Sequence, residues 1–189
     1  PLLGSLLDPA RSLKNDLATP SFDTLRALLE RALSSERPAT LWGEGNEVQD
    51  EAWDHALTAR GLLDAARLLD ARYHLVVTNV PYLGSSRQHP DLKRYCEEVY
   101  SEAKHDLANV FLERCLELVL NEDGVVQVVM PQNWLFLARY ESQRTELLKK
   151  RLWLQLAKLG SGAFETIGGE VVNVILLGLA RRSPEPDSL

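Results

Sequence analysis

Apolar residues recur at helical spacing in the first part of the chain. Residues 8–33 place four leucines on one helical face, with Asp23 near a helix start; these are Leu25, Leu28, Leu29 and Leu33. Residues 34–46 contain proline and several polar and glycine residues, which predict a loop. Residues 47–71 return to helical spacing. We therefore predict that residues 1–71 form a helical segment.

Beyond residue 71 the pattern changes to short apolar runs that alternate with helical stretches. The runs predict strands, and the stretches between them predict helices, one of them with Leu147 and Leu148 facing inward. Strands are expected at 73–78, 125–130, 153–159 and 170–180, and helices at 91–100, 106–120 and 136–151. Such alternation is typical of an α/β fold with a mostly parallel sheet. Residues 72–180 are thus predicted to be one α/β unit, and residues 181–189 a linker.

The most informative loop follows the first predicted strand, where Asn79, Val80, Pro81 and Tyr82 stand in succession. Ligands of α/β sheets bind beyond the carboxyl ends of the strands. The Asn79 carboxamide has a carbonyl acceptor that suits one hydrogen of an amino group, and a main-chain carbonyl of the loop suits the other. Pro81 favours extended geometry at Val80 and so aims that carbonyl. Tyr82 offers a flat ring to a planar partner.

This loop resembles the Asn-Pro-Pro-Tyr motif of amino methyltransferases. Further segments follow in the order found in DNA adenine methyltransferases, especially those of BREX phage-defence and related restriction-modification systems: DLANVFLERCLELVL, GVVQVVMPQNWLF, YESQRTELLKK and GAFETIGGEVVNVILL. The likeness covers nearly the whole chain. Val80 departs from the motif, whose second residue is proline. The family uses the carbonyl of that residue, which valine also has, and what is lost is the fixed φ angle.

The resemblance implies the C-terminal part of a Rossmann-like methyltransferase sheet with an N-terminal helical insertion. It implies S-adenosylmethionine as methyl donor, although no glycine-rich loop follows a strand in this sequence. Since the chain also lacks an initial methionine, we expect a piece of a longer protein with an incomplete cofactor site, inactive alone. Asn79 to Tyr82 would be catalytic, and Tyr82 and Phe164 would stack on the base. Asp106 would either cap a helix or approach the cofactor.

The implied reaction is methylation of the N6 amino group of a flipped adenine in double-stranded DNA, in the bacterial cytoplasm. The net charge of −6 argues against tight DNA binding by this chain alone, so the rest of the parent protein is an expected partner. Two cysteines and four histidines form no zinc pattern, and no apolar run would span a bilayer; we expect neither a metal nor a membrane partner. Two alternatives remain: methylation of protein glutamine or RNA amino groups, and a non-catalytic role in DNA recognition.

Overall fold

The computed structural model describes residues 3–13, 24, 27, 28, 31, 47–160 and 173–184. The chain divides into two compact units, Gly4–Ala71 and Arg72–Leu189, the latter together with Pro1–Leu3. The first unit contains a short turn of helix η1 (Gly4–Leu6), helix α1 (Pro9–Leu13) and the 24-residue helix α3 (Glu47–Asp70). The helix expected at 47–71 is therefore confirmed. Most of the helix expected at 8–33 lies outside the described residues.

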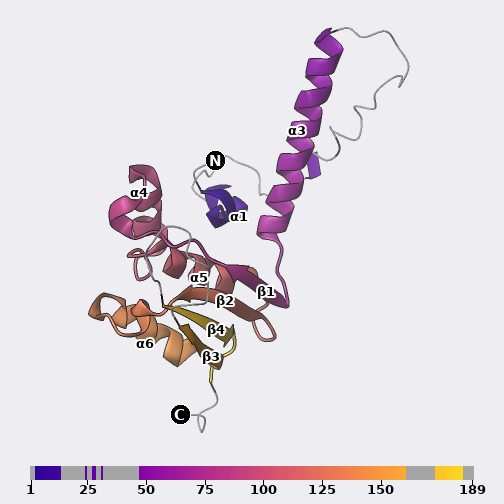
Figure 1. Ribbon diagram of the computed structural model, residues 1–189. Coiled ribbons are helices and arrows are strands. Elements are labelled where there is room, and N and C mark those ends of the chain that lie inside the picture. The colour runs from indigo at the N-terminus through magenta and orange to yellow at the C-terminus, as the bar shows by residue number, and fades with distance from the viewer. Residues whose placement is uncertain are drawn as a thin grey trace. The chain divides into compact units, whose positions relative to one another are not determined.

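The second unit is built on a four-stranded sheet (Figure 1). Its strands are β1 (Leu75–Asn79), β2 (Val125–Pro131), β3 (Leu152–Gly160) and β4 (Val174–Ala180), in the spatial order β1-β2-β4-β3. β1 and β2 are parallel, whereas β4 is antiparallel to both β2 and β3. β1, β2 and β3 consequently run in the same direction. β4 lies between β2 and β3 and runs in the opposite direction. The expected α/β class is confirmed, but the expectation of a mostly parallel sheet was wrong, since only the β1–β2 pair is parallel and both pairs made by β4 are antiparallel.

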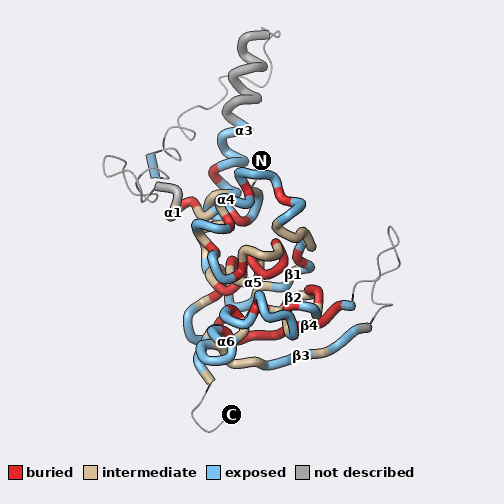
Figure 2. The backbone as a smooth tube through the Cα atoms, turned by 90° about the vertical axis from the view of Figure 1, so that its left-hand side faces the viewer, coloured by how far each residue is buried: buried red, intermediate tan, exposed pale blue. Residues whose placement is uncertain are grey.

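Three helices connect these strands: α4 (Pro90–Val99), α5 (Leu107–Leu118) and α6 (Glu141–Lys150). α5 is apolar over most of its surface because it packs against β2 and contributes to the same core as Leu147 of α6. The buried residues gather between these helices and the sheet (Figure 2). Cys96 and Cys115 lie in this interior as free thiols, and burial raises the pKa of each to about 11.

The helix predicted over 136–151 begins later than expected. Residues Asn133–Leu135 and Ala138–Tyr140 instead form two single 3₁₀ turns, η3 and η4, and α6 starts only at Glu141. The Arg144 side chain donates to the carbonyls of Trp134 (2.6 Å) and Leu137 (2.7 Å), which holds this irregular segment. The prediction that Leu147 and Leu148 both face inward was half wrong, since Leu147 is 3% exposed and Leu148 48%. Consecutive helical residues point about 100° apart, so one of the two must face solvent.

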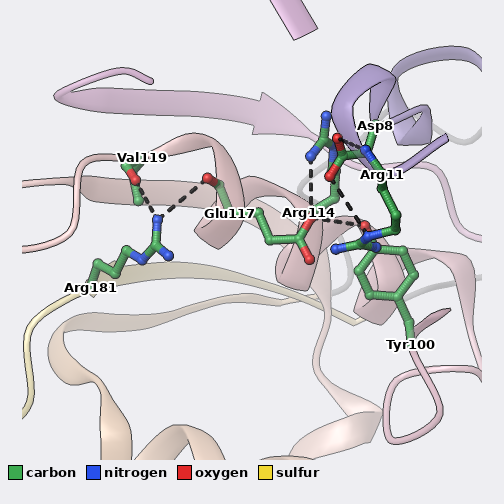
Figure 3. A network of polar contacts seen from close by, with 7 residues as sticks. All are labelled: Asp8, Arg11, Tyr100, Arg114, Glu117, Val119 and Arg181. Atoms are coloured by element: carbon green, nitrogen blue, oxygen red, sulfur yellow. Dashed lines mark hydrogen bonds and ion pairs between the residues drawn. The ribbon is translucent and has the colours of Figure 1, made fainter. Parts of the chain in front are cut away.

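The carboxyl end of α5 is tied to its neighbours by charged side chains (Figure 3). Arg181, directly after β4, donates to the carbonyls of Val119 (2.7 Å) and Glu117 (3.4 Å). Glu117 in turn accepts hydrogen bonds from Arg114 (3.2 Å) and from the hydroxyl of Tyr100 (3.1 Å), the C-cap residue of α4. Helix ends leave carbonyls without intrahelical partners, and a cation there satisfies them. These bonds fix α4 and α5 relative to the sheet.

Candidate active site

Successive side chains at the end of β1 and in the loop that follows it lie alternately in solvent and in the core. Asn79 is the last residue of β1 and is exposed, whereas the side chain of Val80 is only 3% exposed and belongs to the main core. Pro81 is exposed again, and Tyr82 is half-buried against the core. The Val80 amide also donates to the Val129 carbonyl at 3.4 Å. Val80 thus anchors the loop, a role that the sequence analysis missed although Val76, Thr78 and Val80 share one face of the strand.

Asn79 and Tyr82 interact directly. The Tyr82 hydroxyl donates a hydrogen bond to Asn79 Oδ1 at 3.4 Å, which is long for this type of bond. Burial raises the pKa of Tyr82, so its hydroxyl keeps its proton at neutral pH. The carboxamide carbonyl and the aromatic ring that the sequence singled out therefore lie side by side in the same loop.

Asp106 joins this loop to α5. It is the N-cap of α5: its Oδ1 accepts from the Ala108 amide at 2.9 Å and also from the Leu83 amide at 3.4 Å. Main-chain bonds extend the link, from Leu107 N to the Leu83 carbonyl (3.0 Å) and from Ser85 N to the His105 carbonyl (3.0 Å). The capping role of Asp106 is therefore present in the structure. It also holds the candidate loop against the start of α5.

The segment that follows β2 begins at the same edge of the sheet as the loop after β1, because β1 and β2 are parallel. The Tyr140 ring packs edge-on against His105, with the centroids 5.7 Å apart, and Arg139 lies 5.1 Å from the centroid of Tyr140. Burial, followed by the charges of Arg139 and Lys104, lowers the pKa of His105. Phe136, in the same segment, differs from the buried Tyr140 because its side chain is 74% exposed. The sequence analysis did not single out His105 or Tyr140, and no recognisable motif marks them.

Phe164, the second aromatic residue expected beside the base, lies outside the described residues. The proposed pair of Tyr82 and Phe164 rings therefore stays a prediction. Among the described residues, no three or more histidine, cysteine or acidic side chains are grouped as a metal site would need. Within the same part of the chain, no helix has both the length and the apolar character to cross a membrane.

Comparison with known proteins identifies the family. Residues 14–164 match the family model of the Eco57I restriction-modification methylase, which is most of the chain. The chain belongs to this family. The expected resemblance to the methyltransferases of restriction-modification and BREX systems is confirmed.

Two curated relatives of this chain are adenine-specific methyltransferases. The adenine-specific methyltransferase BrxX of Escherichia coli O9:H4 (strain HS) is 34% identical over 170 residues, which is 89% of this chain and 13% of the relative. The adenine-specific methyltransferase PglX of Lacticaseibacillus casei (strain Zhang) is 29% identical over 170 residues, 90% of this chain and 13% of the relative. The chain thus spans about an eighth of the length of these two relatives.

A solved structure supports the fold. A modification subunit assigned to a type I restriction enzyme of Vibrio vulnificus YJ016 matches 68% of this chain and 30% of its own, with a TM-score of 0.50 and 18% identity. At this level of identity the likeness concerns the arrangement of helices and strands. The expected Rossmann-like methyltransferase architecture agrees with it.

Proposed function

We propose that this chain supplies the amino-group site of a DNA adenine methyltransferase, which transfers a methyl group from S-adenosylmethionine to adenine N6. The observation that carries the proposal is the exposed Asn79 carboxamide at the carboxyl end of β1, beside Tyr82 and followed by the carbonyl of a buried Val80. Family membership and the adenine-specific relatives support the choice of adenine.

The chemistry begins from a poor nucleophile, since the lone pair of the adenine amino group is delocalised into the purine. Asn79 Oδ1 accepts one amino hydrogen and the Val80 carbonyl accepts the other, which makes the nitrogen more electron-rich. The same two acceptors stabilise the positive charge that develops on nitrogen during transfer, an effect of fixed dipoles already in place. No general base is needed before the methyl group moves. The hydrogen bond from Tyr82 to Asn79 is exchanged for the one from the amino group.

The target base must first leave the duplex, at a cost of a few kcal/mol. Tyr82 recovers part of that cost by stacking on the extruded base, and Phe164 is proposed to stack on the opposite face. This assignment makes the half-buried position of the Tyr82 ring functional, because a ring held against the core is oriented before the base arrives.

S-adenosylmethionine, when bound, supplies the electrophilic methyl group. Asp106 fits a role in holding it, because Oδ1 is used in capping α5 while no described residue donates a hydrogen bond to Oδ2. A hydroxyl or ammonium donor of the cofactor matches that free acceptor. We further propose that the main cofactor loop belongs to other parts of a longer methyltransferase, which agrees with the coverage of only 13% of each curated relative.

The proposal is tested by Asn79→Ala in the intact enzyme that contains this chain. Loss of one acceptor should reduce methyl transfer to duplex DNA by about 100-fold or more. Asn121→Ala is the matched control, because Asn121 is exposed in the turn before β2, at the opposite edge of the sheet. Radioactive methyl incorporation into DNA, RNA and protein is measured in parallel. If the Asn79→Ala enzyme methylated DNA at a rate within threefold of wild type, this role would be excluded. Methyl incorporation into RNA or protein but not into DNA would show that the substrate is RNA or protein.

A further inference from the structure

The ladder of hydrogen bonds between β1 and β2 ends just before the carbonyl of Val80. In the parallel register, Asn79 lies opposite Val129, and the Val80 amide donates to the Val129 carbonyl at 3.4 Å. In a parallel ladder the next bond runs from the amide two residues further along β2 back to the Val80 carbonyl. That amide would belong to residue 131, which is proline and has no N–H.

Proline is unusual at this position of a sheet. β2 has β1 on one side and β4 on the other, and proline within such a strand removes a ladder hydrogen bond. Pairing with β4 is undisturbed, because Pro131 lies opposite Val174 and the next amide, of Gln132, donates to the Asn173 carbonyl at 2.9 Å. Pro131 is therefore the last residue of β2 and leaves the pairing with β4 intact. It removes a donor on the β1 side only.

The carbonyl left without its ladder partner is the one that the proposed mechanism uses. Among the described residues none donates a hydrogen bond to the Val80 carbonyl oxygen, from either main chain or side chain. The Val80 side chain is buried in the core, so the peptide that carries this carbonyl is held in place. The result is a fixed main-chain acceptor at the carboxyl edge of the sheet, one residue after Asn79.

We infer that Pro131 is a positioning residue for methyl transfer, which keeps the Val80 carbonyl available to the amino group of the base. This inference rests on the proposed function. An N–H at position 131 would bond to the Val80 carbonyl, draw it toward β2 and lower the negative charge that it offers to a second donor. Pro131 acts through Val80 and touches no reacting atom itself.

The test uses three forms of residue 131 in the intact enzyme. Pro131→Ala introduces an N–H and removes the ring. Replacement of Pro131 by lactic acid, through an α-hydroxy acid incorporated during translation, gives the same methyl side chain with an ester oxygen in place of the N–H. The two replacements therefore share a side chain and differ in the main-chain bond, where the ester lacks the N–H and has a somewhat weaker Met130 carbonyl acceptor. Wild type shows the effect of losing the proline ring. Hydrogen exchange of the new main-chain amide in the Pro131→Ala enzyme shows whether that donor is bonded.

Pro131→Ala should lower kcat on duplex DNA at least about tenfold with KM for DNA little changed, because the acceptor acts mainly in the transition state. The amide that this substitution introduces should be protected from exchange, and the lactic acid form should restore kcat to within about threefold of wild type. Equal losses in both replacements would assign the effect to the ring and overturn the inference. So would full activity of Pro131→Ala, or an unprotected amide.

The design separates this inference from the function on which it rests. If wild type methylates adenine and Asn79→Ala does not, the proposed function holds, and the residue 131 series decides the role of Pro131 alone. If wild type fails to methylate adenine under conditions in which it binds S-adenosylmethionine, the proposed function fails and the inference fails with it.

Discussion

Tyr82 combines two contributions that substitutions can separate. Its ring packs on the core beside the proposed base site, and its hydroxyl makes the 3.4 Å bond to Asn79 Oδ1. Tyr82→Phe keeps the ring and loses a long bond that the amino group would displace, so methylation should fall less than about threefold, equivalent to under 1 kcal/mol. Tyr82→Ala loses the ring. We expect it to slow methylation by about 10- to 100-fold, in line with ~1–3 kcal/mol for stacking on one base.

The measurement is steady-state methylation of duplex DNA, together with the fluorescence of 2-aminopurine at the target position, which rises when the base is extruded. Tyr82→Ala should weaken that signal and Tyr82→Phe should keep it. If Tyr82→Phe proved as inactive as Tyr82→Ala, the hydroxyl rather than the ring would be the functional group, and stacking by Tyr82 would be refuted.

At the scale of elements, two glycines, Gly124 just before β2 and Gly178 within β4, differ sharply in the space around them. A Cβ added at Gly124, where β2 begins, would collide with the Leu120 carbonyl oxygen and lie 2.5 Å from Val119 Cβ, both of them firmly placed. A Cβ at Gly178 would meet Gln127 Oε1 at 2.7 Å, which is the end of a flexible side chain, and Gln155 Cβ at 3.3 Å, a contact that a shift of a few tenths of an ångström relieves. Gly124→Ala should therefore lower the free energy of unfolding by about 2 kcal/mol or more, as overpacking does.

Gly178→Ala is the matched control, with an expected change below about 1 kcal/mol because Gln127 can move aside. Chemical denaturation of both variants gives the comparison. The Gln127 amide donates to Gln155 Oε1 at 3.1 Å across β4, and this bond is what Gly178→Ala would disturb. Equal destabilisation by the two substitutions would show that the α5–β2 connection adapts more readily than its close contacts indicate.

The interface between α5 and α6 contains an acid whose ionisation opposes folding. Burial raises the pKa of Glu113, against the smaller opposite effect of the Gln143 amide, which donates to Glu113 Oε1 at 2.8 Å. Because the folded-state pKa lies above the unfolded value, Glu113 contributes stability below about pH 4.5, and this is lost as pH rises through the folded pKa. Above the unfolded-state pKa, the raised folded-state pKa of Glu113 lowers the free energy of unfolding relative to a group without such a shift.

Glu113→Gln should thus raise the free energy of unfolding at pH 7 and flatten its dependence on pH above the unfolded-state pKa of about 4.5. The substituted amide still offers an oxygen to Gln143. Glu98→Gln, exposed on α4, serves as the control and should change stability by less than about 0.5 kcal/mol. Urea titrations at several pH values measure both variants. Destabilisation by Glu113→Gln at pH 7 would mean that the charge is needed by a neighbour.

The elements also show what periodicity can and cannot predict. Apolar runs located the four strands and α5 to within a few residues, since burial on one or both faces dictates them. They did not predict that residues 133–140 would form 3₁₀ turns, because that depends on Arg144 reaching back to two carbonyls and on the buried Trp134. The motif singled out Asn79 and Tyr82, which the structure places in hydrogen-bond contact, and their role in methylation stays a prediction. The missing donor at Pro131 required the register of β1 against β2, which no local pattern contains.

At the scale of the whole molecule, β1 stands at one end of the described sheet order, and its outer apolar residues face solvent. Leu75 is 57% exposed and Val77 65%, while Val76 on the opposite face packs against the core. Apolar residues at alternating positions of a β-strand are typical of a covered face. We expect that, in the intact methyltransferase, other parts of the protein cover Leu75 and Val77 and complete the cofactor site.

Val77→Asp tests this by comparing the isolated chain with the intact enzyme. In residues 1–189 alone the substitution falls on an exposed position and should change the free energy of unfolding by less than about 0.5 kcal/mol. In the intact enzyme it would bury a charge without a partner, so we expect a loss of several kcal/mol and weaker S-adenosylmethionine binding. Leu148→Asp, on an exposed position of α6, should be near neutral in both forms.

Chemical denaturation measures the free energy of unfolding, and calorimetric titration measures S-adenosylmethionine binding. Wild-type residues 1–189 should show no micromolar binding of S-adenosylmethionine. Equal effects of Val77→Asp in the two forms, or tight cofactor binding by the isolated chain, would show that this chain needs no covering partner for its site.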